Sequence, residues 1–401
     1  MKKHLTLRML WTVLLLSACS TSITLPKIDR HPIPDSWSRG ELASLPAYDP
    51  SSTDPYRVDL RASDLSSLDL SRSLNDLLYA NFDDRTVWPS ADRMPQGYDW
   101  QRIMELGKDP GLGVRDLHAQ GITGKKVGIA IIDQTLLVDH QEYKDQLRLY
   151  EETDAIVGGW RVAQMHGPAV ASIAVGKTLG VAPEADLYYI ATTFDGDGSD
   201  FTYVANAIRR ILTVNAELPR GRKIRVISMS IGWGPDVRGY DALTDATEEA
   251  KAAGMLVVCS SIEQVHGFGL SGLGRAPMAD PNVFASYEPG AFWAPDFANA
   301  TWRDSRLNGR LLMPMDSRTT ASPLGDNEYV FYRAGGWSWA IPYIAGVYAL
   351  AAQVDPAITP ERFWSLALET GQTIEINLGG EAIPLGPIVD PVALMDALQS
   401  R

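Results

Sequence analysis

Cysteine is scarce in this chain, which has two cysteines in 401 residues. They are Cys19 and Cys259, so a fold held together by several disulfides is excluded. Cys259 follows the apolar run 255–258, where we expect a small buried side chain and not a catalytic thiol.

Positive charge is also in short supply. The chain has 36 Lys and Arg residues against 49 Asp and Glu residues, which gives a net charge of −13. An acidic surface repels the phosphates of nucleic acids and of anionic lipids, and it favours solubility. We therefore expect no nucleic-acid partner.

The N-terminal apolar run, residues 9–16, is too short to span a membrane. It follows the cations Lys2, Lys3 and Arg8, a pattern typical of an export signal. Residues 16–19 read Leu-Ser-Ala-Cys and resemble the cleavage site of bacterial lipoproteins. An ordinary secretory signal with an incidental cysteine is the alternative.

The lipoprotein resemblance implies that residues 1–18 are removed and that Cys19 carries acyl chains. Removal of three positive charges and no negative ones changes the net charge to −16. Several acyl chains hold a protein firmly on a bilayer. We therefore expect attachment to the cell membrane on its extracytoplasmic face, through Cys19.

The residues after Cys19 divide into three parts. Residues 19–56 are rich in Pro, Ser and Asp, which predicts a flexible spacer. Residues 57–112 carry many leucines with Trp88 and Trp100, enough to pack as an N-terminal extension. A propeptide is the alternative, and the packed extension is favoured. Residues 113–401 form the main domain.

Apolar strands alternate with helical segments in the main domain. The predicted strands are residues 126–133, 186–192, 223–230 and 254–261, and the predicted helices between them are 201–215 and 242–253. This alternation predicts an α/β fold, an open parallel sheet with helices on both faces. Ligands of such sheets bind at the carboxyl ends of the strands, where Asp133 lies.

Three segments supply an acid, a base and a nucleophile. Asp133 ends a buried strand, His166 opens a helix, and Ser338 follows a Gly-Gly turn at the start of an apolar helix. A serine hydroxyl needs an imidazole to take its proton and a carboxylate to orient that imidazole. Each residue alone is weak evidence, but together they predict a catalytic triad.

The order Asp133, His166, Ser338 resembles that of the subtilisin-like serine peptidases. The resemblance runs from about Gly113 to the C-terminus. Its further motifs are residues 121–127, 139–143, 180–185, 228–232 and 312–314. It implies the subtilisin-like open parallel sheet, an acyl-enzyme formed on Ser338 and hydrolysis of peptide bonds. It also implies that Ser230, Ile231 and Gly232 bind the substrate backbone.

One departure concerns the oxyanion hole, where the family has an Asn side chain and this sequence has Glu263. Loss of that donor costs about 10²–10³ in turnover, a figure measured on a member of this family. The backbone N–H of Ser338 remains a donor. The second donor is Gln264, His266 or a protonated Glu263, and Gln264 is favoured because its amide is chemically closest to Asn.

Other departures surround the triad. Gln134 follows Asp133, and Trp337 and Trp339 flank Ser338. The two tryptophans either narrow the cleft or pack against the first turn of the helix. These differences indicate a divergent member with restricted substrates. The histidines His118 and His140 are expected to be structural.

The segment 194–200 alternates carboxylates with glycine, which suggests calcium, but it lacks the later Glu of an EF-hand loop. Asp200 or Ser199 would instead cap the following helix. We expect no required cofactor, with calcium as a structural ion the alternative, and a monomer. The competing function is a peptide-binding protein of this fold with weak or no catalysis, a hypothesis motivated by Glu263.

Overall fold

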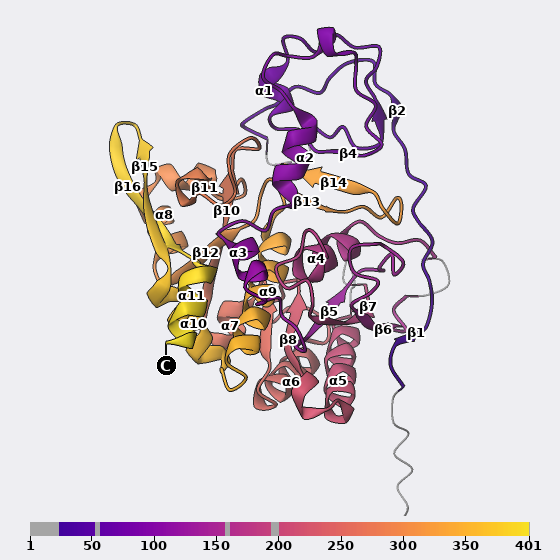
Figure 1. Cartoon of the computed structure of the whole chain (residues 1–401), viewed down its shortest axis with the longest axis vertical. Helices are drawn as coiled ribbons and strands as arrows, with labels where there is room; N and C mark the ends of the chain where they lie inside the picture. Colours follow the sequence, from indigo (N-terminus) through magenta and orange to yellow (C-terminus); the bar gives the residue numbers. More distant parts are fainter. Residues whose placement is uncertain (1–23, 53–56, 157–160, 194–199, 401) are drawn as a thin grey trace, which may run out of the picture.

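The centre of the protein is a six-stranded parallel sheet (Figure 1). The computed structural model describes residues 24–52, 57–156, 161–193 and 200–400. In spatial order the strands are β1 (Lys27–Ile28), β6 (Leu147–Glu152), β7 (Asp186–Ala191), β5 (Gly128–Asp133), β8 (Ile224–Met229) and β9 (Leu256–Cys259). The four predicted strands are all present, each somewhat shorter than expected.

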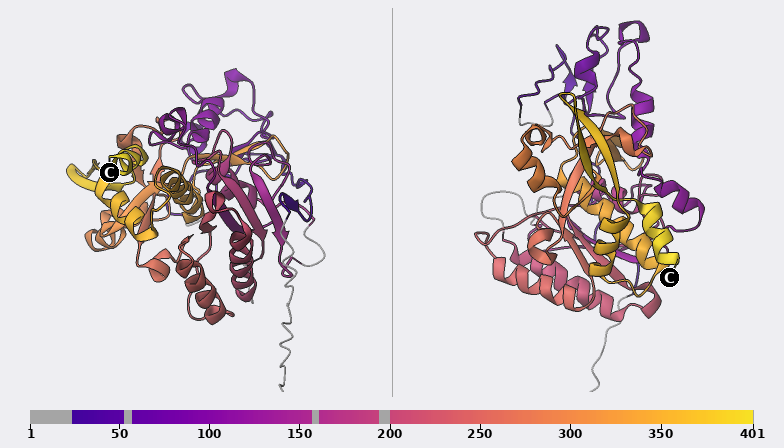
Figure 2. Two further views of the ribbon diagram at one scale, coloured as in Figure 1. Left: turned by 60° about the horizontal axis from the view of Figure 1, so that its bottom comes forward. Right: turned by 90° about the vertical axis from the view of Figure 1, so that its left-hand side faces the viewer.

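Helices cover both faces of this sheet (Figure 2). Helices α5 (Thr202–Glu217) and α6 (Tyr240–Ala252) cover one face, and each buries one apolar side. Helices α4 (His166–Val175) and α9 (Trp337–Val354) cover the other face and are buried almost all round, which is why their sequences are apolar throughout. The predicted α/β class is confirmed.

A second sheet adjoins the first and completes the C-terminal half. Its order is β11 (Tyr287–Pro289), β10 (Gly269–Arg275), β12 (Arg310–Pro314), β16 (Glu381–Ile388) and β15 (Gln372–Leu378). The helices of this half are α7 (Ile262–His266), α8 (Ala300–Leu307), α10 (Pro360–Thr370) and α11 (Pro391–Gln399). Across the part of the chain that is described, no helix has the length and apolarity to cross a bilayer.

The N-terminal extension packs against the main domain through a small antiparallel sheet. Strand β4 (Phe82–Asp83) pairs with β14 (Tyr329–Tyr332), which pairs with β13 (Arg318–Ala321). The extension also contains β3 (Ser63–Asp64), α1 (Leu74–Leu77) and α2 (Trp100–Lys108), and α3 (Val114–Ala119) follows it. Strand β2 (Gly40–Glu41), from the preceding segment, pairs with β3. Its own core includes Phe331 from β14. A bound propeptide would pack similarly, so both alternatives stay open.

The prediction of a flexible spacer over residues 19–56 is wrong for the described residues 24–52. Strand β1 pairs with the edge strand β6, and Ile33 forms a bridge with Val162. Arg30 makes an ion pair with Glu152. Proline is compatible with an extended segment at a sheet edge, because one side of that strand needs no backbone donor. Composition therefore failed to distinguish a spacer from an edge strand.

Candidate active site

Asp133 is the last residue of β5 and is fully buried between β7 and β8. Its Oδ1 accepts hydrogen bonds from the His166 Nδ1–H at 2.6 Å and from the Gln134 N–H at 2.8 Å. Its Oδ2 is buried and has no hydrogen-bond partner among the described residues. The carboxylate is thus held at the carboxyl edge of the sheet, directed at an imidazole.

His166 is the first residue of α4, and the glycine after it explains how it reaches Asp133. A Cβ at Gly167 would lie 2.7 Å from the Gln134 carbonyl oxygen and 2.7 Å from the Tyr189 hydroxyl. Only glycine allows the helix to begin this close to the strand end. The His166 side chain remains 16% exposed. With Nδ1–H donated to Asp133, Nε2 is the nitrogen available for base chemistry.

Ser338 is the second residue of α9, after a turn in which Gly336 has a φ of 66°. Pro342 within this helix lacks the N–H that would bond to the Ser338 carbonyl. The Ser230 hydroxyl donates to that carbonyl instead, at 2.9 Å. The Ser338 Oγ lies 3.5 Å from the Ser230 carbonyl oxygen. The nucleophile candidate is therefore fixed at the end of β8.

The backbone N–H of Ser338 belongs to the first turn of an 18-residue helix. Such N–H groups have no partner within the helix, and the helix dipole places partial positive charge there. This is the environment that an oxyanion requires.

Trp339 lies between the imidazole and the serine turn. Its side chain is buried, and its ring centroid is 5.4 Å from that of His166 and 5.4 Å from that of Tyr332. The backbone of Gly335 packs against the indole so closely that a Cβ there would lie 2.4 Å from it. Of the two alternatives for Trp339, packing is correct. Trp337 is only partly buried.

The predicted substrate-binding residues 230–232 continue directly from the end of β8. The Ile231 carbonyl accepts a hydrogen bond from the Ser260 N–H at 2.9 Å, and the Ile231 side chain is buried. This carbonyl therefore links the segment to the residues after β9. Gly232 is exposed, so the backbone there is accessible to an extended peptide.

Glu263 does not act as a buried, protonated donor. It lies in α7 with 64% of its side chain exposed, and its carboxylate makes an ion pair of 2.5 Å with Arg310. A carboxylic acid is kept neutral by burial in apolar surroundings, which are missing here. That alternative for the oxyanion donor is wrong.

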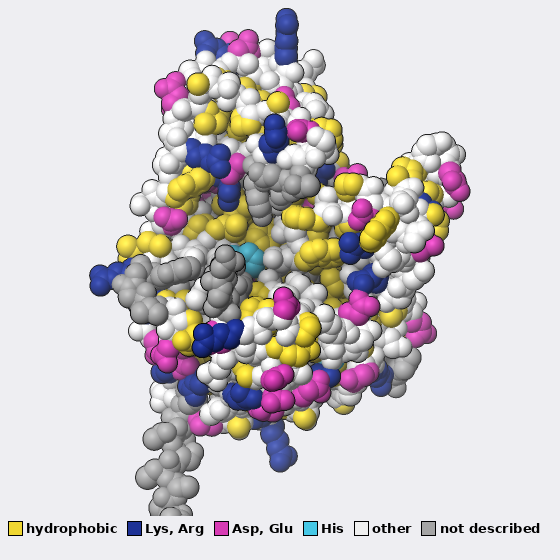
Figure 3. All heavy atoms as spheres, turned by 180° about the vertical axis from the view of Figure 1, so that it is seen from behind, with side chains coloured by type: hydrophobic (Ala, Val, Ile, Leu, Met, Phe, Trp, Pro, Cys, Tyr) yellow, Lys and Arg dark blue, Asp and Glu magenta, His cyan; other side chains and the backbone are white. Residues whose placement is uncertain are grey.

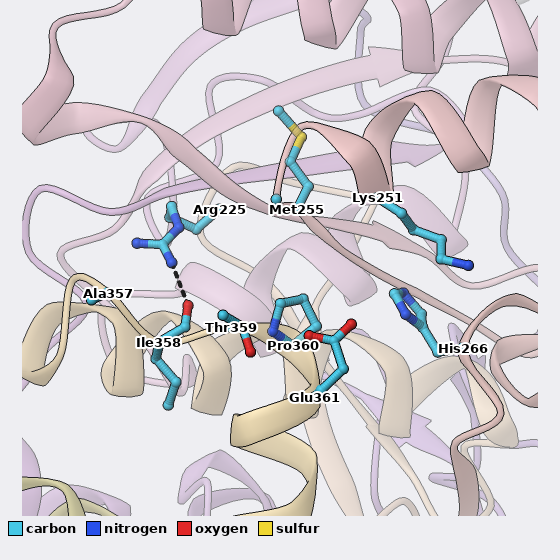
Figure 4. A pocket seen from close by; sticks show the side chains of 10 residues that line it. Arg225, Lys251, Met255, His266, Ala357, Ile358, Thr359, Pro360 and Glu361 are labelled. Carbon is cyan, nitrogen blue, oxygen red and sulfur yellow. Dashed lines mark hydrogen bonds between the residues drawn. The ribbon is translucent and has the colours of Figure 1, made fainter.

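His266 lies at the opposite end of β9 from the triad. Its Nε2 accepts from the Val257 N–H at 3.3 Å, and its ring faces a pocket shared with Lys251 and Glu361 (Figure 4). Burial lowers its pKa to about 4. His266 is therefore not the oxyanion donor. Gln264, exposed in α7, stays a prediction.

Asp316 was not identified from the sequence. It is buried, and it accepts hydrogen bonds from the Gly335 N–H at 2.9 Å and the Ala291 N–H at 2.8 Å. Burial raises its pKa to about 6. The carboxylate thus ties the serine turn to the loop before Trp293. The sequence feature that could have identified Asp316 is a carboxylate directly after the apolar run 311–315.

The other singled-out residues have structural roles where the structure describes them. The His118 Nε2–H donates to the Val181 carbonyl at 2.8 Å, and the His140 Nε2–H donates to the Glu328 carbonyl at 3.0 Å. Cys259 is buried, which raises the pKa of its thiol to about 12 and opposes thiolate formation.

Two predictions fall outside the described residues. Cys19 is one, and most of the calcium segment, residues 194–199, is the other. The described Asp200 accepts a hydrogen bond from the Thr202 N–H at 2.9 Å, but the N-cap of α5 is Phe201, so the prediction that Asp200 is the capping residue is wrong by one position. Within the described ranges, no group of three or more His, Cys, Asp or Glu side chains could hold a metal ion.

The face opposite that of Figure 1 is hollowed between the N-terminal extension and the main domain (Figure 3). Histidine atoms are visible in this hollow, with hydrophobic side chains around them. The histidine atoms seen there therefore lie in an accessible hollow whose side chains are largely apolar.

The comparisons with known proteins point to one family. Residues 124–281, which include Asp133 and His166, match the subtilase family, Peptidase S8. The major intracellular serine protease of Bacillus subtilis (strain 168) is 27% identical over 268 residues, 62% of this chain and 77% of that protein. Subtilisin NAT of Bacillus subtilis subsp. natto is 26% identical over 251 residues, 61% of this chain and 60% of that protein.

A solved structure, that of the prenylagaramide maturation protease PagA, is similar over 71% of this chain and 98% of that chain, with a TM-score of 0.48 and 15% identity. The sequence matches thus make residues 124–281 similar to the subtilase family, and 61–62% of the chain similar to two subtilisin-like serine proteases.

Proposed function

We propose that this protein is an active serine endopeptidase that uses Asp133, His166 and Ser338. The observation that carries the proposal is the 2.6 Å hydrogen bond from the His166 Nδ1–H to a fully buried carboxylate, beside the helix that begins at the serine turn. Such a bond fixes the tautomer that can take a proton from a serine hydroxyl and stabilises the imidazolium that results.

The proposed reaction has two steps. The Ser338 Oγ attacks the peptide carbonyl while His166 takes its proton, and the imidazolium then protonates the leaving amine. Water attacks the acyl-enzyme in the second step, again with His166 as base. The substrate lies extended along residues 230–232. The Ser338 N–H and the Gln264 amide are the proposed oxyanion donors.

Restricted specificity is part of the proposal. Phe292 is 45% exposed and lies against the serine turn, where a Cβ at Gly336 would be 3.3 Å from its ring. Trp337, which follows Gly336 in the chain, is partly buried. Two large apolar side chains at this place favour substrates with complementary apolar groups and disfavour bulky polar ones.

The alternative is a peptide-binding protein without catalysis, and the observation in its favour is Glu263 at the position of the family Asn. The cost of that exchange, about 10²–10³ in turnover, slows an enzyme without abolishing its reaction. Burial of a carboxylate with one unpartnered oxygen lowers the stability of the fold. A catalytic role for Asp133 would explain why such a residue is present.

The experiment is active-site labelling of the purified protein with a fluorophosphonate. We expect covalent modification of wild type at Ser338, because His166 activates only that hydroxyl, and none in Ser338→Ala. Ser66→Ala removes an exposed hydroxyl of the extension and serves as the control, with labelling equal to wild type. Failure of several fluorophosphonates to label wild type would exclude the active-enzyme proposal and favour the peptide-binding alternative.

We also propose attachment to the membrane through acyl chains on Cys19. The support is the sequence of residues 2–19. Cys19→Ala should release the protein from the membrane fraction or leave it as an uncleaved precursor of higher mass, as fractionation and immunoblotting would show. Mature-sized Cys19→Ala that stays with membranes would contradict a lipid anchor at this residue.

A further inference from the structure

A basic pocket lies on an otherwise acidic protein. Five cations line a cavity of about 380 Å³, together with Gln353 and Pro356 and without any Asp or Glu side chain; they are Lys125, Lys126, Arg220, Lys223 and Arg225. Four cations fall within residues 220–225 alone, in a chain with a net charge of −13. The proposed mechanism makes no use of this site, which we call the basic pocket.

Nearby carboxylates neutralise little of this charge. Lys125 pairs with Glu184 at 3.3 Å, and both side chains are exposed. Lys223 and Arg225 donate to backbone carbonyls, those of Asn215 and Ile358 among others.

The two remaining cations, Lys126 and Arg220, are exposed, and neither forms an ion pair with a described residue. The pocket therefore offers several donors and net positive charge to an anionic group.

The basic pocket lies at the edge of the sheet opposite the triad. Lys126 precedes the start of β5 by two residues, and Lys223 immediately precedes β8. Asp133 is the last residue of β5. Six residues of strand separate the two edges by about 20 Å. If the basic pocket were bound to a membrane surface, the triad would therefore face away from that surface.

The direction of β1 places the N-terminal segment at the same edge. Strand β1 runs parallel to β6, so the chain approaches Lys27 from the amino end of the sheet. Lys27 lies eight positions after Cys19 in the chain, a distance of at most about 28 Å even when fully extended. An acyl anchor on Cys19 therefore keeps this edge near the bilayer.

We propose that the basic pocket docks on anionic phospholipid headgroups and orients the protein with its triad facing away from the membrane. The role in orientation rests on the proposed anchor at Cys19. Lysine and arginine form charge-assisted hydrogen bonds with phosphate oxygens. The net negative charge of the remaining surface repels an anionic bilayer, so this edge is the one that faces it. The net negative charge disfavours anionic lipids at the protein surface as a whole, and the basic pocket is a local exception.

The test uses the full mature chain, residues 19–401, without acyl chains and carrying Cys19→Ala. It is sedimented with vesicles of phosphatidylcholine alone or with about a third phosphatidylglycerol. We expect binding to the anionic vesicles only, and binding that weakens as salt is raised. The double variant Lys126→Glu with Arg220→Glu should lower partitioning at least about tenfold, since each cation near an anionic surface adds a several-fold factor.

The matched control is Arg72→Glu with Arg102→Glu, two exposed cations of the N-terminal extension. It changes the net charge equally and should bind as the parent does. Equal binding to both vesicle types, or equal loss in the control, would overturn the proposal. Far-ultraviolet circular dichroism shows that each variant is folded. Because this chain has no acyl chains, the result is independent of whether Cys19 is lipidated in cells.

Discussion

Asp133→Asn is expected to lower turnover by about four orders of magnitude while the fold is retained. The Asp133 Oδ1 accepts both the His166 Nδ1–H and the Gln134 N–H. An amide whose oxygen takes the place of Oδ1 can still accept both bonds, and its NH₂ group replaces the unpartnered Oδ2. The neutral amide no longer stabilises the imidazolium that forms when His166 takes the Ser338 proton. The measurement is kcat on a peptide amide, supported by the rate of fluorophosphonate labelling.

The chain offers a matched control for this substitution. The His31 Nδ1 lies 2.8 Å from the Asp139 Oδ2 in an exposed pair with the same chemistry as the His166 pair. Asp139→Asn should leave turnover within about twofold of wild type, because exposed pairs contribute little and this one is not at the triad. A loss below tenfold for Asp133→Asn would mean that this carboxylate does not orient the catalytic base.

The sequence predicted the parts of the fold that local patterns determine. Strand β5 is six buried residues in a row that end in Asp133, and such a run is characteristic of the interior of a parallel sheet. The Gly-Gly turn before Ser338 is equally local, because a φ of 66° at Gly336 is a backbone state that favours glycine. The fold class and the triad segments followed from features of this kind.

Features that depend on distant partners could not be predicted. Strand β1 has two residues and exists because β6, about 120 residues later, offers an unpaired edge. The exposed position of Glu263 depends on α7, a five-residue helix without a strong pattern, and on Arg310, which lies 47 residues away. Asp316 matters because it joins two loops. None of these pairings has a signature in the local sequence.

Trp339→Ala is expected to reduce the free energy of unfolding by about 3–5 kcal/mol, the usual cost of removing a buried tryptophan. It should also lower turnover about a hundredfold, because the indole packs beside the His166 ring and under the serine turn, and small displacements of catalytic groups cost about this much. Unfolding by urea is measured in the Ser338→Ala background, which prevents self-digestion. Turnover is measured with Ser338 present.

Trp339→Phe separates ring packing from the indole N–H. The Trp339 Nε1–H is buried and has no hydrogen-bond partner among the described residues. Phenylalanine keeps a ring in place and removes a donor whose unsatisfied burial costs about 1–3 kcal/mol, which offsets the volume lost. We therefore expect stability within about 1 kcal/mol of wild type and turnover within about fivefold.

Trp364→Ala distinguishes a role at the triad from general destabilisation. Trp364 in α10 is also buried, its ring stacks on Phe268 at 4.8 Å, and its Nε1–H likewise has no partner among the described residues. Its removal should cost a similar free energy of unfolding but leave turnover unchanged at temperatures where the variant is folded. If Trp339→Ala and Trp364→Ala lowered turnover equally, the indole of Trp339 would be a core residue only. A selective loss in Trp339→Ala means that the residue after the nucleophile also positions the base, which links the two halves of the triad through one side chain.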